Sequence, residues 1–215
     1  MSKKYCFFDL DGTLTDSAPG IMRCFRIALD KFGLSEPEDE KLRFIIGPPL
    51  HYSFSVGFGL SEEDTVKAVA YYREEYSVKG YVECTVYDGV RETLEKLTDN
   101  GVICALVTSK PAMYAPKVIA HQGLDKYFSC ISAPLKDEAD PGKAKLIDRA
   151  RAELGVSEID KVYMIGDRKY DMEGAKNTGV CGIGALWGFG DREELECAGA
   201  DFIAEHPADI LKIVF

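Results

Sequence analysis

Two pairs of aspartates in this sequence stand directly after short apolar runs, where they could form a catalytic or cation-binding site. Asp9 and Asp11 follow the run Tyr5–Phe8, and Asp167 and Asp171 follow a second run and a glycine. Runs of this length are typical of buried strands, and an open parallel sheet binds its ligands at the carboxyl ends of its strands. Carboxylates gathered there repel one another, and a cation relieves the repulsion. The alternative is an acidic turn before a helix, but two independent junctions favour a site.

The stretch Asp-Leu-Asp-Gly-Thr-Leu at residues 9–14 resembles the first motif of the haloacid dehalogenase superfamily, and in particular of its phosphatases. The stretch Gly-Asp-Arg-Lys-Tyr-Asp at 166–171 resembles the Gly-Asp-x-x-x-Asp motif of the same superfamily. The resemblance covers nearly the whole chain and implies a Rossmann-like core. It also implies a hydroxyl residue and a lysine near the ends of later strands.

Thr108 is the expected hydroxyl residue, because it directly follows the apolar run 102–107 and the family's residue at that point binds the phosphoryl group. A helix cap is the alternative, and Ser109 serves that role equally well. For the lysine, Lys143 is favoured because it begins the apolar face of a predicted helix at 143–154. Many relatives carry Lys-Pro at this point, whereas this chain has Lys-Ala. Three other lysines rank below it: Lys110, Lys136 and Lys145.

By this resemblance, Asp9 attacks phosphorus to form an aspartyl-phosphate, and Asp11 protonates the leaving group and then activates water. Mg²⁺ is the implied cofactor, because oxygen ligands and a substrate phosphate suit this cation. Its implied ligands are the Asp9 carboxylate, the Asp11 backbone carbonyl, Asp167 and, directly or through water, Asp171. The implied phosphate contacts are Gly12, Thr108, Ser109 and Lys143, of which Thr108 and Lys143 stabilise charge on the transferring group.

Between residues 86 and 215, apolar strands alternate with helices, which predicts a parallel sheet covered on both faces. Strands are expected at 102–107, 130–132, 162–165, 180–184 and 201–203, and helices at 89–98, 112–122, 143–154, 172–177 and 192–198, with a last helix after Pro207. Residues 16–85 show only helical patterns, at 17–31, 38–46 and 61–76. We therefore expect an α/β fold, with a Rossmann-like catalytic core at 1–15 and 86–215 and a small all-helical cap domain at 16–85.

The position of this cap resembles that in the phosphoglycolate phosphatase-like branch of the superfamily, and we expect the cap to choose the substrate. The loop 46–51 resembles one that relatives turn toward the active site. Arg23 and His51 are candidates for contacting the leaving group; a solvated helix charge and a surface histidine are the alternatives. The stretch 184–190 also resembles the family, and we interpret it as a structural turn with an aromatic plug.

The expected reaction is Mg²⁺-dependent hydrolysis of a small phosphorylated metabolite, either phosphoglycolate-like or a nucleoside 5′-monophosphate. A phosphomutase shares the core motifs and stays an alternative, and a non-catalytic phosphate-ligand binding protein is the alternative of a different class. Dehalogenases of this fold lack the second acid, Asp11, and need no metal. Phosphonate hydrolysis requires a cap lysine, and no lysine of this cap is favoured for that role.

Net charge and cysteine content indicate which classes of binding partner and which cellular compartment to expect. The 215 residues carry a formal net charge of −10, which disfavours binding to nucleic acid and to anionic membranes. The seven cysteines form no Cys-x-x-Cys pair, and this favours reduced thiols in the cytoplasm. We expect no signal peptide, because the apolar stretch near residue 5 reaches Asp9 too soon, and no apolar run has membrane-spanning length. We therefore expect a cytoplasmic enzyme that acts as a monomer or homodimer on a small molecule.

Overall fold

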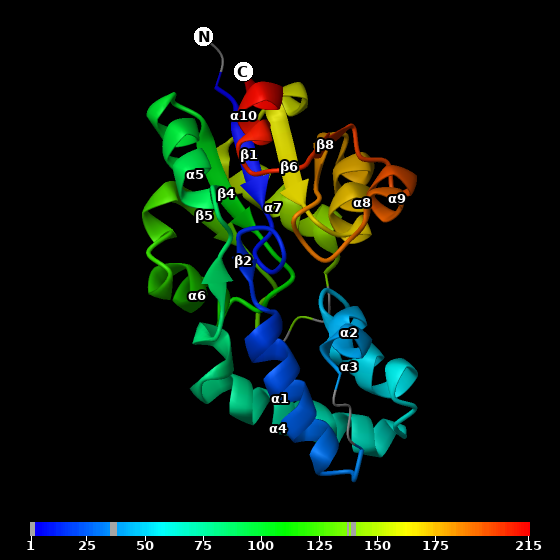
Figure 1. Cartoon of the computed structure of the whole chain (residues 1–215). Coiled ribbons are helices and arrows are strands. Elements are labelled where there is room, and N and C mark those ends of the chain that lie inside the picture. Colours follow the sequence, from blue (N-terminus) through cyan, green and yellow to red (C-terminus); the bar gives the residue numbers. More distant parts are fainter. Residues whose placement is uncertain (1–2, 35–37, 137, 139–140) are drawn as a thin grey trace. The chain divides into compact units, whose positions relative to one another are not determined.

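The computed structural model of the chain describes residues 3–34, 38–136, 138 and 141–215 (Figure 1). The chain divides into a core unit, residues 1–16 with 86–215, and a helical unit, residues 17–85. The sequence placed the first boundary after residue 15, one residue earlier. Each unit is described by itself below.

The core unit is built on a six-stranded parallel sheet with the strand order β5-β4-β1-β6-β7-β8. Its central strand is β1 (Tyr5–Phe8), in which Tyr5 lies opposite Ile103 on one side and Val162 on the other. The other strands are β4 (Ile103–Val107), β5 (Phe128–Ser132), β6 (Val162–Gly166), β7 (Cys181–Ala185) and β8 (Phe202–Ala204). All residues of β1 are buried, as the unbroken apolar run predicts for a strand covered on both faces.

Helices cover both faces of this sheet, which confirms the expected fold class. On one face, α7 (Lys143–Leu154) and α8 (Lys169–Thr178) join a buried cluster with Phe7 and Met164. Phe8 points to the other face, where it meets residues of α5 (Val90–Asp99) and α10 (Asp209–Val214). The remaining helical segments are α6 (Ala115–His121), α9 (Arg192–Cys197) and the 3₁₀ turns Asp125–Tyr127 and Ile159–Lys161.

The helical unit has its own aromatic core between α1 (Ala18–Asp30) and α4 (Glu62–Val78). The ring of Phe25 stacks on Phe54 with centroids 3.9 Å apart and meets the edge of Tyr72 at 6.1 Å. In the sequence, α1 and α4 are separated by α2 (Asp39–Leu42), α3 (Leu50–Tyr52) and the helical turns Arg43–Ile45 and Ser53–Gly57. The 3₁₀ turn Gly80–Val82 follows α4. The chain passes between the units through β2 (Thr15–Asp16) and β3 (Thr85–Val86), which pair with each other.

One expected helix start was wrong, and some helical turns were not predicted. The helix expected from residue 112 begins at Ala115, because 111–114 form a turn and Pro116 suits the first turn of a helix. The helical turns between residues 50 and 57 were not predicted, since Pro49 was taken only as a helix stop.

The buried face of α4 was not predicted from the sequence. Its buried positions are Thr65, Ala68, Tyr72 and Tyr76, whereas the apolar residues Val66 and Ala70 are exposed. The large aromatic rings decide the face, because they complete the cluster around Phe25. Among the described residues, no helix is both long enough and apolar enough to cross a membrane.

Candidate active site

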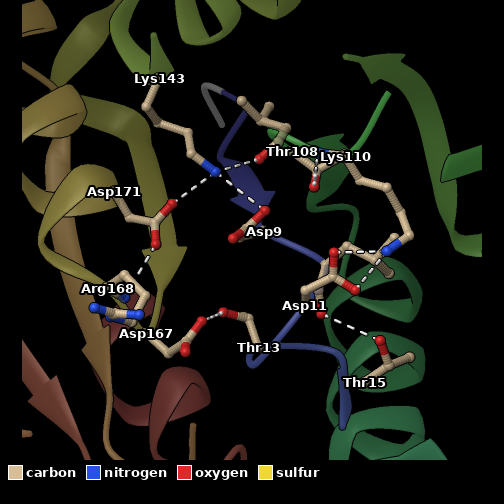
Figure 2. A network of polar contacts seen from close by, with 12 residues as sticks. Asp9, Asp11, Thr13, Thr15, Thr108, Lys110, Lys143, Asp167, Arg168 and Asp171 are labelled. Atoms are coloured by element: carbon tan, nitrogen blue, oxygen red, sulfur yellow. Dashed lines mark hydrogen bonds and ion pairs between the residues drawn. The ribbon is translucent and has the colours of Figure 1, made fainter. Parts of the chain in front are cut away.

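The carboxyl ends of three adjacent strands bring the predicted site residues together (Figure 2). Asp9 is the residue after β1, Thr108 the residue after β4, and Asp167 the residue after β6. Parallel strands end at the same edge of a sheet, so residues that are far apart in the sequence meet here. Each element is an apolar strand that stops where a polar residue follows.

Asp9, Asp167 and Asp171 form a carboxylate cluster, in which one oxygen from each lies within 4.8 Å of the others. Asp167 is fully buried and Asp171 is 1% exposed. Oδ1 of Asp9 and Oδ1 of Asp171 are buried, and each forms an ion pair with the same ammonium group, that of Lys143. Three carboxylates gathered around a single ammonium group are costly to bury without a further cation.

Lys143 supplies part of the missing positive charge. Its Nζ lies 3.0 Å from Asp9 Oδ1 and 2.7 Å from Asp171 Oδ1, and it donates a hydrogen bond to the Val107 carbonyl at 3.1 Å. Burial by itself lowers the pKa of this ammonium group, but the carboxylates of Asp171 and Asp9 outweigh it and raise the pKa. Lys143 is therefore a permanent charge between two aspartates, as the helical spacing of α7 predicts.

The pKa values of the two buried acids show that one lysine does not balance the cluster. Burial, followed by repulsion from Asp171 and Asp9, raises the pKa of Asp167 to about 8. Burial also raises the pKa of Asp171 to about 6, although Lys143 opposes the shift. A hard divalent cation would reverse both shifts, and three carboxylates are the donor set that such a cation prefers. The residues present therefore fit a divalent metal ion.

Two hydrogen bonds hold the Asp167 carboxylate, one on each oxygen. The Thr13 hydroxyl donates to Oδ1 at 2.9 Å, and the backbone N–H of Phe189 donates to Oδ2 at 2.9 Å. Gly12 lies against the same carboxylate with φ +88°, and a Cβ there would stand 2.1 Å from Asp167 Oδ2. The sequence proposed Gly12 as a phosphate contact and did not predict the contacts of Thr13 and Phe189.

Lys110 is a second buried lysine, and it holds the second acid of the first motif. Its Nζ lies 2.8 Å from Asp11 Oδ1 and 2.7 Å from Oδ2, and its side chain is 5% exposed. Its backbone N–H donates to Thr108 Oγ1 at 3.1 Å. Sequence analysis ranked Lys110 below Lys143 as the lysine expected to bind the phosphoryl group. The structure gives each lysine its own acids, and the carboxylate of Asp11 is not among the three that converge.

The remaining candidates lie elsewhere. Ser109 is exposed, and so is Lys136. Lys145 is exposed as predicted and pairs with Glu138 at 3.0 Å. In the helical unit, Arg23 Nε lies 2.5 Å from Glu83 Oε2, and His51 Nε2 lies 3.0 Å from Glu62 Oε1. Both of these side chains therefore have acidic partners within their own unit.

Fold and site together are those of an α/β protein with an aspartate cluster that could hold a metal ion, and comparison with known proteins gives its family. Residues 6–185 match the family described as haloacid dehalogenase-like hydrolase. The chain is 39% identical to a 5′-nucleotidase of Pseudomonas aeruginosa over 87% of its length and 85% of that relative. It is 30% identical to a phosphoglycolate phosphatase of Vibrio parahaemolyticus, over 98% of its length and 96% of that relative. The chain belongs to the haloacid dehalogenase-like hydrolase family.

A further relative and two solved structures also resemble this chain. The tyrosine-protein kinase PtkA of Mycobacterium tuberculosis is 35% identical over 88% of this chain and 64% of that relative. Among solved structures, a "predicted phosphatase" from Clostridium acetobutylicum is 37% identical with a TM-score of 0.92, and each chain is covered to 99%. A haloacid dehalogenase-like family hydrolase from Streptococcus pneumoniae is 31% identical with a TM-score of 0.91, again at 99% coverage of both chains.

Proposed function

We propose that this phosphatase is a Mg²⁺-dependent phosphomonoester hydrolase that works through an aspartyl-phosphate on Asp9. One observation carries the proposal: three carboxylates converge at the sheet edge beside a buried lysine, with a hydroxyl and a second acid–lysine pair next to them. A protein that only bound phosphate would have no need for a second acid held in place beside the first.

In the first step, a carboxylate oxygen of Asp9 attacks phosphorus, and the bond from phosphorus to the leaving oxygen breaks. Asp11 gives its proton to that leaving oxygen. In the second step, Asp11 takes a proton from a water molecule as the water attacks phosphorus. This attack breaks the bond from Asp9 to phosphorus and restores both acids. Lys110 contacts both oxygens of Asp11 and thereby sets the direction in which this carboxyl group points.

Thr108 and Lys143 bind the transferring phosphoryl group. The Thr108 oxygen accepts a hydrogen bond from Lys110 N–H, so its own O–H is left to donate to a phosphoryl oxygen. Lys143 presents a permanent positive charge beside Asp9. Both groups stabilise negative charge that moves onto the phosphoryl oxygens in the transition state.

Asp9, Asp167 and Asp171 would hold the Mg²⁺ ion, with the backbone carbonyl of Asp11 as a further ligand. When bound, the ion neutralises charge on the carboxylates and the phosphate and helps to orient the substrate. The convergence of three carboxylates beside a single ammonium group and the raised pKa of Asp167 support this assignment.

The proposed substrates are small phosphorylated metabolites, either phosphoglycolate-like or nucleoside 5′-monophosphates. The support is that relatives with these two names match the chain over most of its length. We propose that the helical unit, residues 17–85, is the cap that selects among them, with Arg23 and His51 as candidate contacts. We further propose a cytoplasmic enzyme.

The test is phosphate release from phosphoglycolate, nucleoside monophosphates, sugar phosphates and p-nitrophenyl phosphate, with Mg²⁺ and with EDTA. We expect release that requires both Mg²⁺ and Asp9, and a loss of at least about a thousandfold in Asp9→Asn. Asp148→Asn is a matched control, because Asp148 is a surface acid that pairs only with the nearby Arg151 among the described residues.

Two results would contradict the proposal. Asp9→Asn with the wild-type rate would remove the nucleophile assignment. Isomerisation of a sugar phosphate without net release of phosphate would identify a phosphomutase in place of a phosphatase.

A further inference from the structure

The stretch Trp187–Gly190, which joins β7 to α9, encloses Asp167. Sequence reasoning took this stretch as a structural turn with an aromatic plug. In the structure, the Phe189 N–H donates to Asp167 Oδ2, and the Trp187 indole Nε1–H donates to the Thr13 carbonyl at 2.9 Å. Thr13 in turn donates its hydroxyl to Asp167 Oδ1 (Figure 2). The stretch therefore contacts Asp167 once directly and once through Thr13.

Three glycines allow the backbone to come this close. A Cβ at Gly188 would lie 2.3 Å from the Cβ of Asp167 and 2.4 Å from the Gly12 carbonyl oxygen. A Cβ at Gly190 would lie 2.1 Å from the Asp167 carbonyl oxygen, and one at Gly12 would meet the carboxylate itself. No side chain fits at these distances, so glycine is required wherever the two loops meet Asp167.

We propose that Trp187–Gly190 and Thr13 form a positioning element that fixes the Asp167 carboxylate for the metal ion. This inference rests on the proposed function, which supplies the ion. A carboxylate with one directed hydrogen bond on each oxygen cannot rotate freely, and one of its oxygens lies within 4.8 Å of carboxylate oxygens of Asp9 and Asp171. Groups that hold a metal ligand in this way raise metal affinity, because the ligand needs no reordering when the ion binds.

Thr13 is the most direct place to test the positioning element. It is 1% exposed, so Thr13→Val removes the hydroxyl with little change in shape, and Thr13→Ser keeps the hydroxyl. Thr93→Val is the matched control, because Thr93 is 2% exposed and lines the same small cavity as Thr13 and Trp187, so this variant changes the packing beside the element without removing a hydrogen bond to Asp167. Trp187→Phe removes the indole N–H and retains an aromatic ring.

The measurement is Mg²⁺ affinity by isothermal titration calorimetry on the full-length variants, without substrate. We expect Thr13→Val to weaken Mg²⁺ binding about tenfold or more, as is typical when a hydrogen-bond partner of a metal ligand is lost. Thr13→Ser and Thr93→Val should bind Mg²⁺ within about threefold of wild type, and Trp187→Phe should fall between them and Thr13→Val.

Trp187 is the single tryptophan of the chain, so its fluorescence reports on the element itself. We expect Mg²⁺ to change the emission of the wild type, with the midpoint at the calorimetric affinity. In Thr13→Val the midpoint should move to higher Mg²⁺ concentration, while Thr93→Val should keep the wild-type midpoint.

A purely structural plug predicts a different outcome. Thr13→Val and Trp187→Phe would then lower the unfolding midpoint in EDTA but bind Mg²⁺ as tightly as wild type, and this result would overturn the inference. Failure of the proposed function gives a distinct pattern. A wild type that binds Mg²⁺ but releases no phosphate would contradict the phosphatase mechanism, whereas the loss of Mg²⁺ affinity in Thr13→Val would still support the positioning element.

Discussion

The core unit and the helical unit both pair basic side chains with acids, but they do so in different surroundings. In the core unit, Lys143 and Lys110 have side chains that are 3% and 5% exposed, and their partners Asp9 and Asp11 follow β1, far away in the sequence. In the helical unit, Arg23 and His51 pair near the surface, with side chains 33% and 51% exposed. The buried interior of the helical unit is mainly apolar, with aliphatic side chains such as Leu29 and Ile45 beside the stacked rings of Phe25 and Phe54.

This difference supports the proposal that the buried charges of the core unit serve the chemistry. Burying an ion costs free energy that a pair repays only with good geometry, so stability alone rarely keeps a charge inside a protein. The core unit keeps two lysines and two nearly inaccessible aspartates at one sheet edge. The helical unit, which has no such cluster among its described residues, follows the ordinary arrangement of an apolar interior and a charged surface.

Removal of the Lys143 charge is expected to have the largest effect. Lys143→Met leaves the carboxylates of Asp9 and Asp171 buried without their cation, and we expect it to lower the free energy of unfolding by about 3–5 kcal/mol. Urea unfolding in EDTA at pH 8 measures this, and phosphate release should be lost as well. Lys145→Met, on the exposed side of the same helix, should change little. Equal losses in the two variants would contradict the contrast between buried and surface pairs.

Asp167→Asn should raise the free energy of unfolding of the metal-free protein, whereas Lys143→Met lowers it. The folded pKa of Asp167 is about 8, whereas an unfolded aspartate has a pKa near about 3.9. Between those values the folded state holds a proton that the unfolded state has lost, so stability falls as pH rises from about 4 to about 8. Each pKa unit corresponds to about 1.4 kcal/mol of stability. Part of the stability gained in Asp167→Asn is lost again, because the amide forms weaker hydrogen bonds with Thr13 and Phe189 than the carboxylate does.

We therefore expect Asp167→Asn to gain about 3 kcal/mol at pH 8 in EDTA and much less at pH 5. Urea unfolding at both pH values checks the trend. Mg²⁺ should remove the advantage, because the ion binds the ionised Asp167 of the wild type. An Asn variant that is less stable than wild type at pH 8 would show that Asp167 is not destabilising in the metal-free fold.

Lys110→Met tests whether the second buried lysine serves proton transfer. We expect kcat for an alkyl phosphate to fall about tenfold to a hundredfold, because Asp11 loses the group that directs it. p-Nitrophenyl phosphate should be affected much less, since its leaving group departs without a proton. Lys110→Arg should recover part of the rate, because guanidinium also binds both oxygens of a carboxylate. Equal losses on both substrates would assign Lys110 to folding alone.

Arg23→Gln should have the smallest effect. Its ion pair with Glu83 is part-exposed, and such pairs contribute about 1 kcal/mol or less. Thermal unfolding at low and high salt checks this expectation. A selective rise in KM for one substrate of the panel, with stability unchanged, would instead assign Arg23 to substrate recognition and would break the contrast between the two units.

Sequence reasoning predicted the fold class because strand and helix signals are local. Helix α7 was predicted residue for residue, since its apolar face and the Gly155 that follows mark both ends. The junctions at Asp9, Thr108 and Asp167 were predicted for the same reason, as each follows an apolar run. The face of α4 was not, because aromatic packing against α1 overrides the pattern of smaller apolar residues.

The contacts within the site depend on pairings that leave no local signal. Lys110 lies 99 residues from Asp11 in the sequence, and Trp187 lies 174 residues from Thr13. Nothing in the neighbourhood of Lys110 distinguishes it from a surface lysine until β1 and β4 are placed side by side. The motifs therefore indicate which acids form the site, and only the sheet register shows which groups hold them.

The order of strands in the sheet also determines when the core unit can fold during synthesis of the chain. The central strand β1 is made first, but its partners begin only at Ile103 and Val162. Helices α1 and α4 are complete by Val78 and can pack while the rest is still being synthesised. Until β4 emerges, the apolar stretch Tyr5–Phe8 stays an unpaired strand, and until β6 emerges one of its two edges stays open and prone to aggregation. The sheet edge that carries the candidate site is thus completed late, and chains cut short before residue 166 should need chaperones to stay in solution.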